Sequence, residues 1–134
     1  MKPIKFLALD VGERRIGVAA ADSAIKLAYP LTTIAVDGTE LDQLARLMRV
    51  EDTQYLVIGY PRNSHGEPTK QTEAVEAFVA RLSVDTPISY QDESLTSVAA
   101  EKHLASRKKP YTKADIDAHA AAIILTDYME SHYV

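Results

Sequence analysis

Three acidic residues occupy positions from which their carboxylates could act together. Asp10 ends an apolar run just before Gly12, Glu93 ends a second strand-like run, and Asp117 lies early in the last predicted helix. Ligand sites of open α/β sheets collect outside the carboxyl ends of strands, so these side chains could converge on one point. Converging carboxylates repel one another, and a bound cation would relieve that repulsion.

The residue types restrict which cation could do this. The chain has no Cys and no His-Glu-x-x-His pattern, so hard oxygen ligands favour Mg²⁺ or Mn²⁺ over zinc. Such a cluster suits two-metal phosphodiester hydrolysis, with ions roughly 3.5–4 Å apart stabilising the attacking and leaving oxygens. The acids therefore suggest a metal-dependent hydrolase.

Two of the three acids, and two of their acidic neighbours, also have a purely structural interpretation. Asp10 could be a turn former before a glycine, and Glu93 could favour the positive end of the helix that follows it. Asp115 is better explained as the capping partner of Thr112. Asp92 should point away from Glu93, because adjacent strand residues face opposite sides.

The elements that would position these acids follow from hydrophobic periodicity and capping signals. Strands are predicted at Ile4–Leu9, Arg15–Ala21, Tyr29–Val36, Tyr55–Gly59 and Pro87–Gln91. The first predicted helix begins at Thr39, where the sequence reads Thr-x-x-Asp. The second is predicted from the helical spacing of Val75, Phe78, Val79 and Leu82. The third spans Leu95–Ser106 and the fourth runs from Thr112 to Glu130. This β-β-β-α-β-α-β-α-α order predicts an α/β fold with a five-stranded mixed sheet flanked by helices.

Composition limits the remaining possibilities. A chain of 134 residues without a linker or repeat is expected to form one domain over residues 1–134. The absence of cysteine excludes disulfide scaffolds and thiol catalysis, and no apolar run is long enough for a signal peptide or membrane span. We expect a cytoplasmic protein. The net charge of −4 leans against a nucleic-acid partner, and few aromatic residues remain for a base-stacking platform if Phe78 is in the core.

Four sequence blocks nevertheless resemble the YqgF/RuvX family. They are Ala8–Ala19 (ALDVGERRIGVA), Val57–Asn63 (VIGYPRN) with Gly66, Asp92–Ser97 (DESLTS) and Asp117–Leu125 (DAHAAAIIL). The blocks occur in the family's order and span essentially the whole chain. Ser94 is a departure, because the family commonly has Arg there, and Ser cannot hold a phosphate as a guanidinium does.

The resemblance implies a ribonuclease H-like nuclease fold related to Holliday junction resolvases. The family is described both as resolvases and as nucleases maturing the 5′ end of pre-16S ribosomal RNA, a step of ribosome biogenesis. By that analogy, Asp10, Glu93 and Asp117 would be the catalytic, metal-binding acids of an endonuclease. We hypothesise that Asp10 bridges two ions while Glu93 and Asp117 each complete one coordination shell.

Basic residues near the expected site could hold the nucleic acid. Arg14 and Arg15 follow Asp10, Arg62 lies in the loop after a buried strand, and Lys108 and Lys109 belong to a basic loop. Two divalent ions would balance the formal charge of −4, so the net charge does not argue against a nucleic-acid partner such as precursor rRNA or branched DNA.

Other interpretations remain open at this stage. A non-catalytic ribosome-assembly or nucleic-acid-binding module of the same fold would not need the three acids. A nucleotide-binding domain of the actin/hexokinase type also begins with an Asp-x-Gly turn, but such proteins normally need two domains, and the chain lacks a P-loop. The protein could be a monomer or a weak homodimer, because resolvases act on two-fold symmetric junctions.

Overall fold

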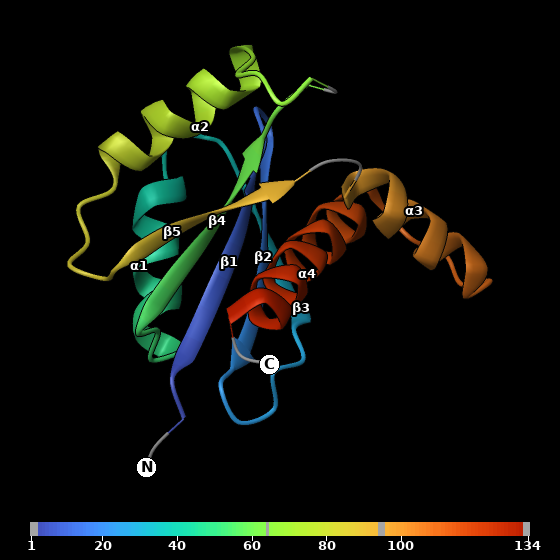
Figure 1. The fold of residues 1–134 in the computed structure, drawn as a ribbon, viewed down its shortest axis with the longest axis horizontal. Coiled ribbons are helices and arrows are strands. Elements are labelled where there is room, and N and C mark those ends of the chain that lie inside the picture. The colour runs from blue at the N-terminus through green and yellow to red at the C-terminus, as the bar shows by residue number, and fades with distance from the viewer. Residues whose placement is uncertain (1–2, 64, 94–95, 133–134) are drawn as a thin grey trace.

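The computed structural model describes residues 3–63, 65–93 and 96–132, and its elements follow the predicted order (Figure 1). The strands are β1 (Lys5–Val11), β2 (Arg15–Asp22), β3 (Tyr29–Ala35), β4 (Tyr55–Pro61) and β5 (Ile88–Glu93). The helices are α1 (Glu40–Val50), α2 (Lys70–Arg81), α3 (Thr96–Ser106) and α4 (Lys113–His132). Ser94 and Leu95, where we expected the third helix to begin, lie outside the described residues.

The five strands form one mixed sheet in the order β3-β2-β1-β4-β5. The pairs β1–β2 and β2–β3 are antiparallel, whereas β1–β4 and β4–β5 are parallel. The carboxyl ends of β1, β4 and β5 therefore meet at one edge of the sheet. The predicted five-stranded mixed sheet is confirmed.

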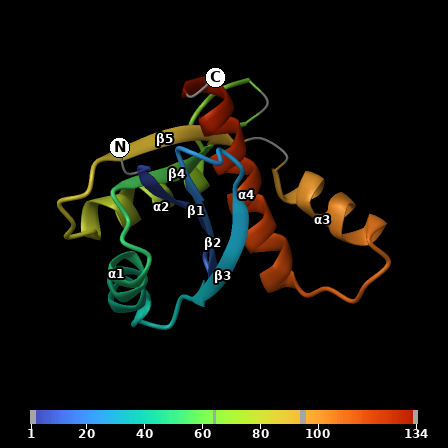
Figure 2. The same cartoon turned by 90° about the horizontal axis from the view of Figure 1, so that it is seen from below.

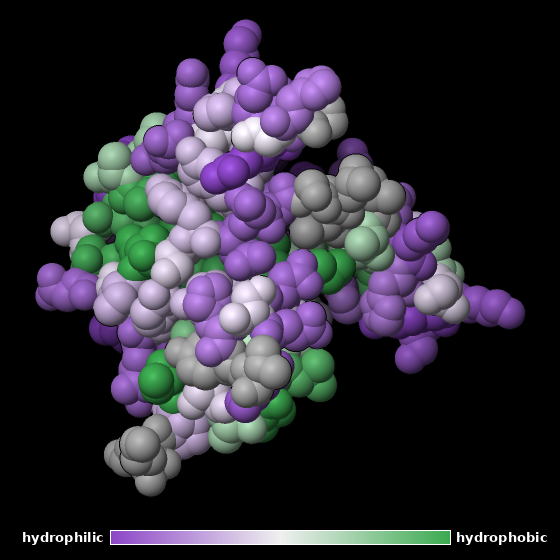
Figure 3. Space-filling view, in the orientation of Figure 1, coloured by the Kyte–Doolittle hydropathy of each residue, from purple (hydrophilic) through white to green (hydrophobic). Residues whose placement is uncertain are grey.

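Helices cover both faces of this sheet (Figures 1 and 2). Leu7, Leu9 and Ile58 face the α1/α2 side, while Phe6 and Ala8 face α4, as the two-residue period of strands requires. Helix α3 packs against α4. On the face seen in Figure 1, hydrophobic residues gather where α1 and α2 flank the sheet, and most of the remainder is hydrophilic (Figure 3). None of the described helices is long and apolar enough to cross a membrane.

Small residues let α4 approach the sheet closely. A Cβ atom added at Gly17 of β2 would lie 1.9 Å from the backbone oxygen of Asp117, so only glycine fits there. Gly17 is also the cross-strand partner of Asp10. This one glycine therefore sets Asp117 beside the strand pair that carries Asp10.

One of the two predicted Thr-x-x-Asp caps is confirmed. At α4, the Thr112 N–H donates to Asp115 Oδ2 at 2.8 Å and the Asp115 N–H donates to Thr112 Oγ1 at 3.2 Å. At α1, Thr39 is the N-cap residue as predicted, but the capping-box hydrogen bond is not formed, because the Thr39 hydroxyl donates to Asp37 Oδ1 at 2.6 Å. An aspartate two residues upstream competes successfully for the same hydroxyl.

Candidate active site at the carboxyl edge of the sheet

Asp10 lies at the carboxyl end of β1, and its surroundings raise its pKa. It is the penultimate residue of β1 and faces α4 with its side chain mostly covered. Burial raises the pKa of Asp10 from 3.8 to about 6; a hydrogen bond with the Glu93 side chain lowers the pKa, and the charge of Asp117 raises it. Asp10 thus interacts with both other acids, which lie 83 and 107 positions further along the chain.

Glu93 reaches Asp10 across the intervening strand. It ends β5, and its neighbour in the sheet is Pro61 of β4. A Cβ atom added at Gly59 of β4 would lie 2.9 Å from both the Glu93 Cδ and Oε2 atoms. The missing side chain at Gly59 is therefore the space through which the Glu93 carboxylate extends toward Asp10.

Asp117 enters the same region from α4 but is engaged by a basic side chain. Its Oδ2 atom lies 2.5 Å from Arg15 Nε, and the two side chains are 21% and 34% exposed respectively. Because Arg15 begins β2, this ion pair fixes α4 to the strand next to β1. The structure thus brings together Asp10, Glu93 and Asp117, with Asp117 paired to Arg15.

The three donors fit a hard divalent cation, because all three are carboxylates. Burial and the charge of Asp117 both raise the pKa of Asp10, and a nearby cation would counteract both effects. Within residues 3–63, 65–93 and 96–132, no three His, Cys, Asp or Glu side chains are grouped as ready ligands. Arg15 occupies Asp117 Oδ2 instead. The donor types fit Mg²⁺ or Mn²⁺, while in this structure Asp117 pairs with Arg15 and Asp10 makes a hydrogen bond with Glu93.

The other basic residues selected from the sequence have different surroundings. Arg62 Nε lies 3.3 Å from Asp92 Oδ1, which confirms that Asp92 points away from Glu93. Arg14, Lys108 and Lys109 are exposed, and Lys108 has a positive φ of 56° between α3 and α4. Arg15 is the exception, because its guanidinium is turned inward to Asp117.

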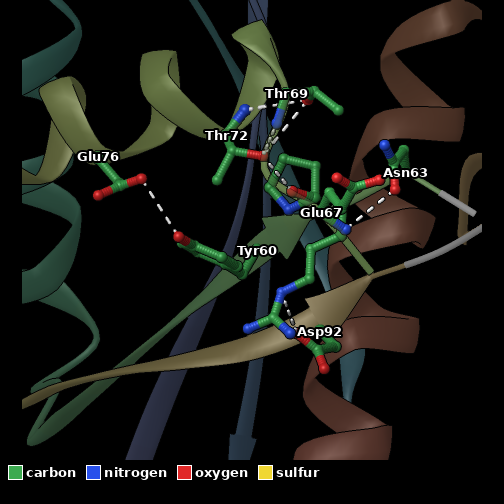
Figure 4. A network of polar contacts seen from close by, with 9 residues as sticks. Tyr60, Asn63, Glu67, Thr69, Thr72, Glu76 and Asp92 are labelled. Carbon is green, nitrogen blue, oxygen red and sulfur yellow. Dashed lines mark hydrogen bonds and ion pairs between the residues drawn. The ribbon is translucent and has the colours of Figure 1, made fainter. Parts of the chain in front are cut away.

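The loop that follows β4 is tied to α2 (Figure 4). Thr72 donates its hydroxyl hydrogen to the Pro61 carbonyl oxygen and forms a capping box with Thr69. Asn63 Oδ1 accepts from the N–H groups of His65 and Glu67, both at 2.9 Å. These bonds hold the loop beside the carboxyl ends of β4 and β5.

The model of one known family matches residues 4–131, which is nearly the whole chain. This chain belongs to the RuvX family of Holliday junction resolvases. Curated relatives include two proteins named "Putative pre-16S rRNA nuclease". The protein from Chloroflexus aurantiacus is 44% identical to this chain, and the match covers 94% of this chain and 86% of the relative. The protein from Crocosphaera subtropica is 43% identical, and the match covers 97% of this chain and 95% of the relative. The resemblance inferred from the four blocks is confirmed.

Two solved structures show the same fold at low sequence identity. T. thermophilus RuvC in complex with a Holliday junction substrate has a TM-score of 0.56 and 14% identity over 96% of this chain and 95% of that one. The fowlpox virus resolvase with junction DNA has a TM-score of 0.54 and 14% identity over 96% and 98%. The ribonuclease H-like fold expected for a RuvX chain is confirmed.

Sequence reasoning missed the residues that let the acids meet. Gly17 and Gly59 both belong to the blocks that resemble the RuvX family, but the sequence does not show what approaches each of them. An isolated glycine within a strand indicates that another backbone or side chain approaches it closely. Both glycines give this signal in the sequence, but it does not identify the approaching group. The Arg15–Asp117 pair spans 102 positions and has no local sequence signal.

Proposed function

We propose that this chain is a metal-dependent nuclease that hydrolyses phosphodiester bonds, using Asp10, Glu93 and Asp117 as its catalytic acids. The observation that supports this best is that Asp10 of β1 makes a hydrogen bond with Glu93 of β5 and interacts electrostatically with Asp117 of α4. A buried Asp with two acidic neighbours is costly for folding alone, and such clusters are characteristic of functional sites. Membership of the RuvX family agrees with a nuclease.

The three acids would hold Mg²⁺ or Mn²⁺, and bound divalent ions supply Lewis-acid stabilisation of a phosphodiester and of its attacking water. Asp10 would be the ligand shared between the ions, and its interactions with both other acids support this role. Glu93 is directed over Gly59, and Asp117 would exchange Arg15 for the cation. The Arg15 guanidinium, which pairs with Asp117 here, would then be available to bind a phosphate of the substrate.

We assign the substrate to nucleic acid, either precursor rRNA or branched DNA, cut by an endonucleolytic mechanism in the cytoplasm. The names of the relatives support the first substrate, and the junction complexes of the structural neighbours support the second. Exposed Arg14, Lys108 and Lys109 would contact the phosphate backbone, together with Arg62. A monomer or weak homodimer is consistent with this role.

A cleavage assay tests the proposal directly. Purified protein is incubated with Mg²⁺ or Mn²⁺ and a four-way junction, linear DNA or precursor rRNA, and the products are resolved on a denaturing gel. We expect cleavage of at least one substrate, and a loss of at least about 100-fold in Asp10→Asn and Glu93→Gln.

Asp85→Asn is the matched control. Asp85 is exposed just before the amino end of β5, at the opposite end of the strand from Glu93. If Asp10→Asn cuts as well as wild type, or if wild type cuts none of the substrates, the nuclease proposal is wrong. Metal-independent binding without cleavage would favour a non-catalytic binding module.

A further inference from the structure

Two tyrosines form an aromatic pair on the α2 side of the sheet, near its carboxyl edge. Tyr60 of β4 and Tyr90 of β5 have ring centroids 4.8 Å apart at an interplanar angle of 61°. Tyr90 is 43% exposed. The Tyr60 hydroxyl donates to Glu76 Oε1 of α2 at 3.2 Å, which fixes the direction of its ring (Figure 4).

A guanidinium completes this cluster. The Arg62 Cζ atom lies 5.1 Å from the centroid of the Tyr60 ring, within the range of a cation–π contact. Arg62 is also held by Asp92, and both of these side chains are exposed. Tyr60, Tyr90 and Arg62 therefore group two aromatic rings and a guanidinium at the surface. We call these three residues the Tyr60–Tyr90–Arg62 platform.

The platform lies on the α2 face of the sheet, whereas the acid cluster lies on the α4 face. Tyr60 pairs with Asp92, and the next pair is Pro61 with Glu93, whose side chain faces α4. The outermost strand, β5, separates the two surfaces, and Tyr90 precedes Glu93 by three positions. Three positions along a strand span roughly 10 Å, a distance that a few nucleotides of a single strand can cover.

We propose that the Tyr60–Tyr90–Arg62 platform binds unpaired bases of the nucleic-acid strand that flanks the cleavage position, by stacking. This inference rests on the proposed function for the origin of the strand, which is taken to run from the acid cluster, whereas stacking of bases on the rings requires neither cleavage nor a bound cation. Aromatic and guanidinium planes stack on any base, so such a surface recognises single-stranded segments without strict sequence preference. A strand leaving the acids around the β5 edge would reach the platform within a few nucleotides.

The charges around the platform favour bases over phosphates. Glu76 and Asp92 contact Tyr60 and Arg62 respectively, so a carboxylate offsets part of the Arg62 charge. Burial, followed by Glu76, raises the pKa of the Tyr60 and Tyr90 phenols, so both remain uncharged near neutral pH. Removing bases from the ligand should therefore weaken binding at the platform, although the phosphate charge is unchanged.

Binding without cleavage tests the platform separately from the nuclease proposal. The affinity of a short fluorescein-labelled single-stranded RNA is measured by anisotropy in EDTA, for wild type, Tyr90→Leu and Tyr90→Phe. We expect Tyr90→Leu to weaken binding roughly 5- to 100-fold, the range for one lost base–aromatic stack. Tyr90→Phe retains the ring and should bind like wild type.

Two controls separate stacking from other effects. Tyr29→Leu removes an exposed tyrosine from β3, the opposite edge strand, and should leave binding unchanged. An oligonucleotide with consecutive abasic sites should bind wild type as weakly as the normal RNA binds Tyr90→Leu. This second comparison needs no variant, so it holds even if Tyr90→Leu fails to fold.

The stacking proposal is overturned if Tyr90→Leu binds RNA as tightly as wild type does. It is also overturned if wild type binds normal and abasic RNA equally well. The rings would then be available to a protein partner. Neither result would change the cleavage assay. Conversely, a failed cleavage assay with ring-dependent binding would refute the nuclease proposal and retain the stacking surface.

Discussion

Replacing Gly17 by alanine should separate α4 from the sheet. The new Cβ would lie 1.9 Å from the Asp117 backbone oxygen, whereas ordinary van der Waals contact begins at 3.4 Å. The missing distance of about 1.5 Å must come from moving helix or strand backbone, because both clashing groups are rigid. Overpacking of this kind typically destabilises by about 1–3 kcal/mol, and we expect the upper end.

An opposite contribution from the unfolded state is smaller. Gly→Ala reduces the conformational entropy of the unfolded chain and alone would stabilise by about 0.4–1 kcal/mol. The net loss in free energy of unfolding should therefore be about 2 kcal/mol or more. Movement of α4 also carries Asp117 away from Asp10, so cleavage should fall together with stability.

Urea unfolding followed by circular dichroism measures this effect, with Gly59→Ala as the matched comparison. At Gly59 the added Cβ would meet the Cδ1 atom of Ile124 at 2.7 Å and the Glu93 carboxylate at 2.9 Å. These are side-chain ends that can rotate, so we expect a loss of only about 1 kcal/mol, with a marked loss of cleavage because Glu93 is displaced. If Gly17→Ala is as stable as wild type or Gly59→Ala, close backbone packing does not position α4.

Two further predictions concern the electrostatics of the site. Because the pKa of Asp10 is raised from 3.8 to about 6 in the fold, metal-free protein should lose stability as the pH rises through that interval. Asp10→Asn should remove that slope in thermal melts in EDTA, and an unchanged slope would contradict the burial argument. Arg15→Ala should reduce the free energy of unfolding by about 1 kcal/mol, since the pair is partly exposed. Mg²⁺ should stabilise this variant more than Arg15→Lys; equal responses would show that Arg15 and a cation do not compete for Asp117.

The sequence predicted the order of elements because each has a strong local signal. Alternation and apolar runs identified strands such as Tyr55–Gly59, and the helical spacing of Val75 and Phe78 identified α2. Asp10 and Glu93 were correctly placed at strand ends of one sheet edge. The order of strands and helices, which local patterns predict well, restricts the sheet topology and therefore the positions of these acids.

Contacts that depend on register could not be predicted in the same way. Tyr60 and Tyr90 meet only because β4 and β5 pair with one particular offset, Ile58 with Tyr90, and no local pattern fixes that offset. The Arg15–Asp117 pair likewise depends on how far α4 slides along β2. Thr39 shows a further difficulty, because a neighbouring Asp37 can redirect a correctly identified capping residue.

The last helix has a consequence for how the protein is made. Helix α4 supplies Asp117 and also covers Phe6, Ala8 and Val57 on one whole face of the sheet. A growing chain that ends before residue 113 therefore has two of the three acids and an unprotected apolar face. Helix α4 thus protects this face and contributes the third acid at the same time, so a chain synthesised only as far as α3 carries an incomplete acid cluster.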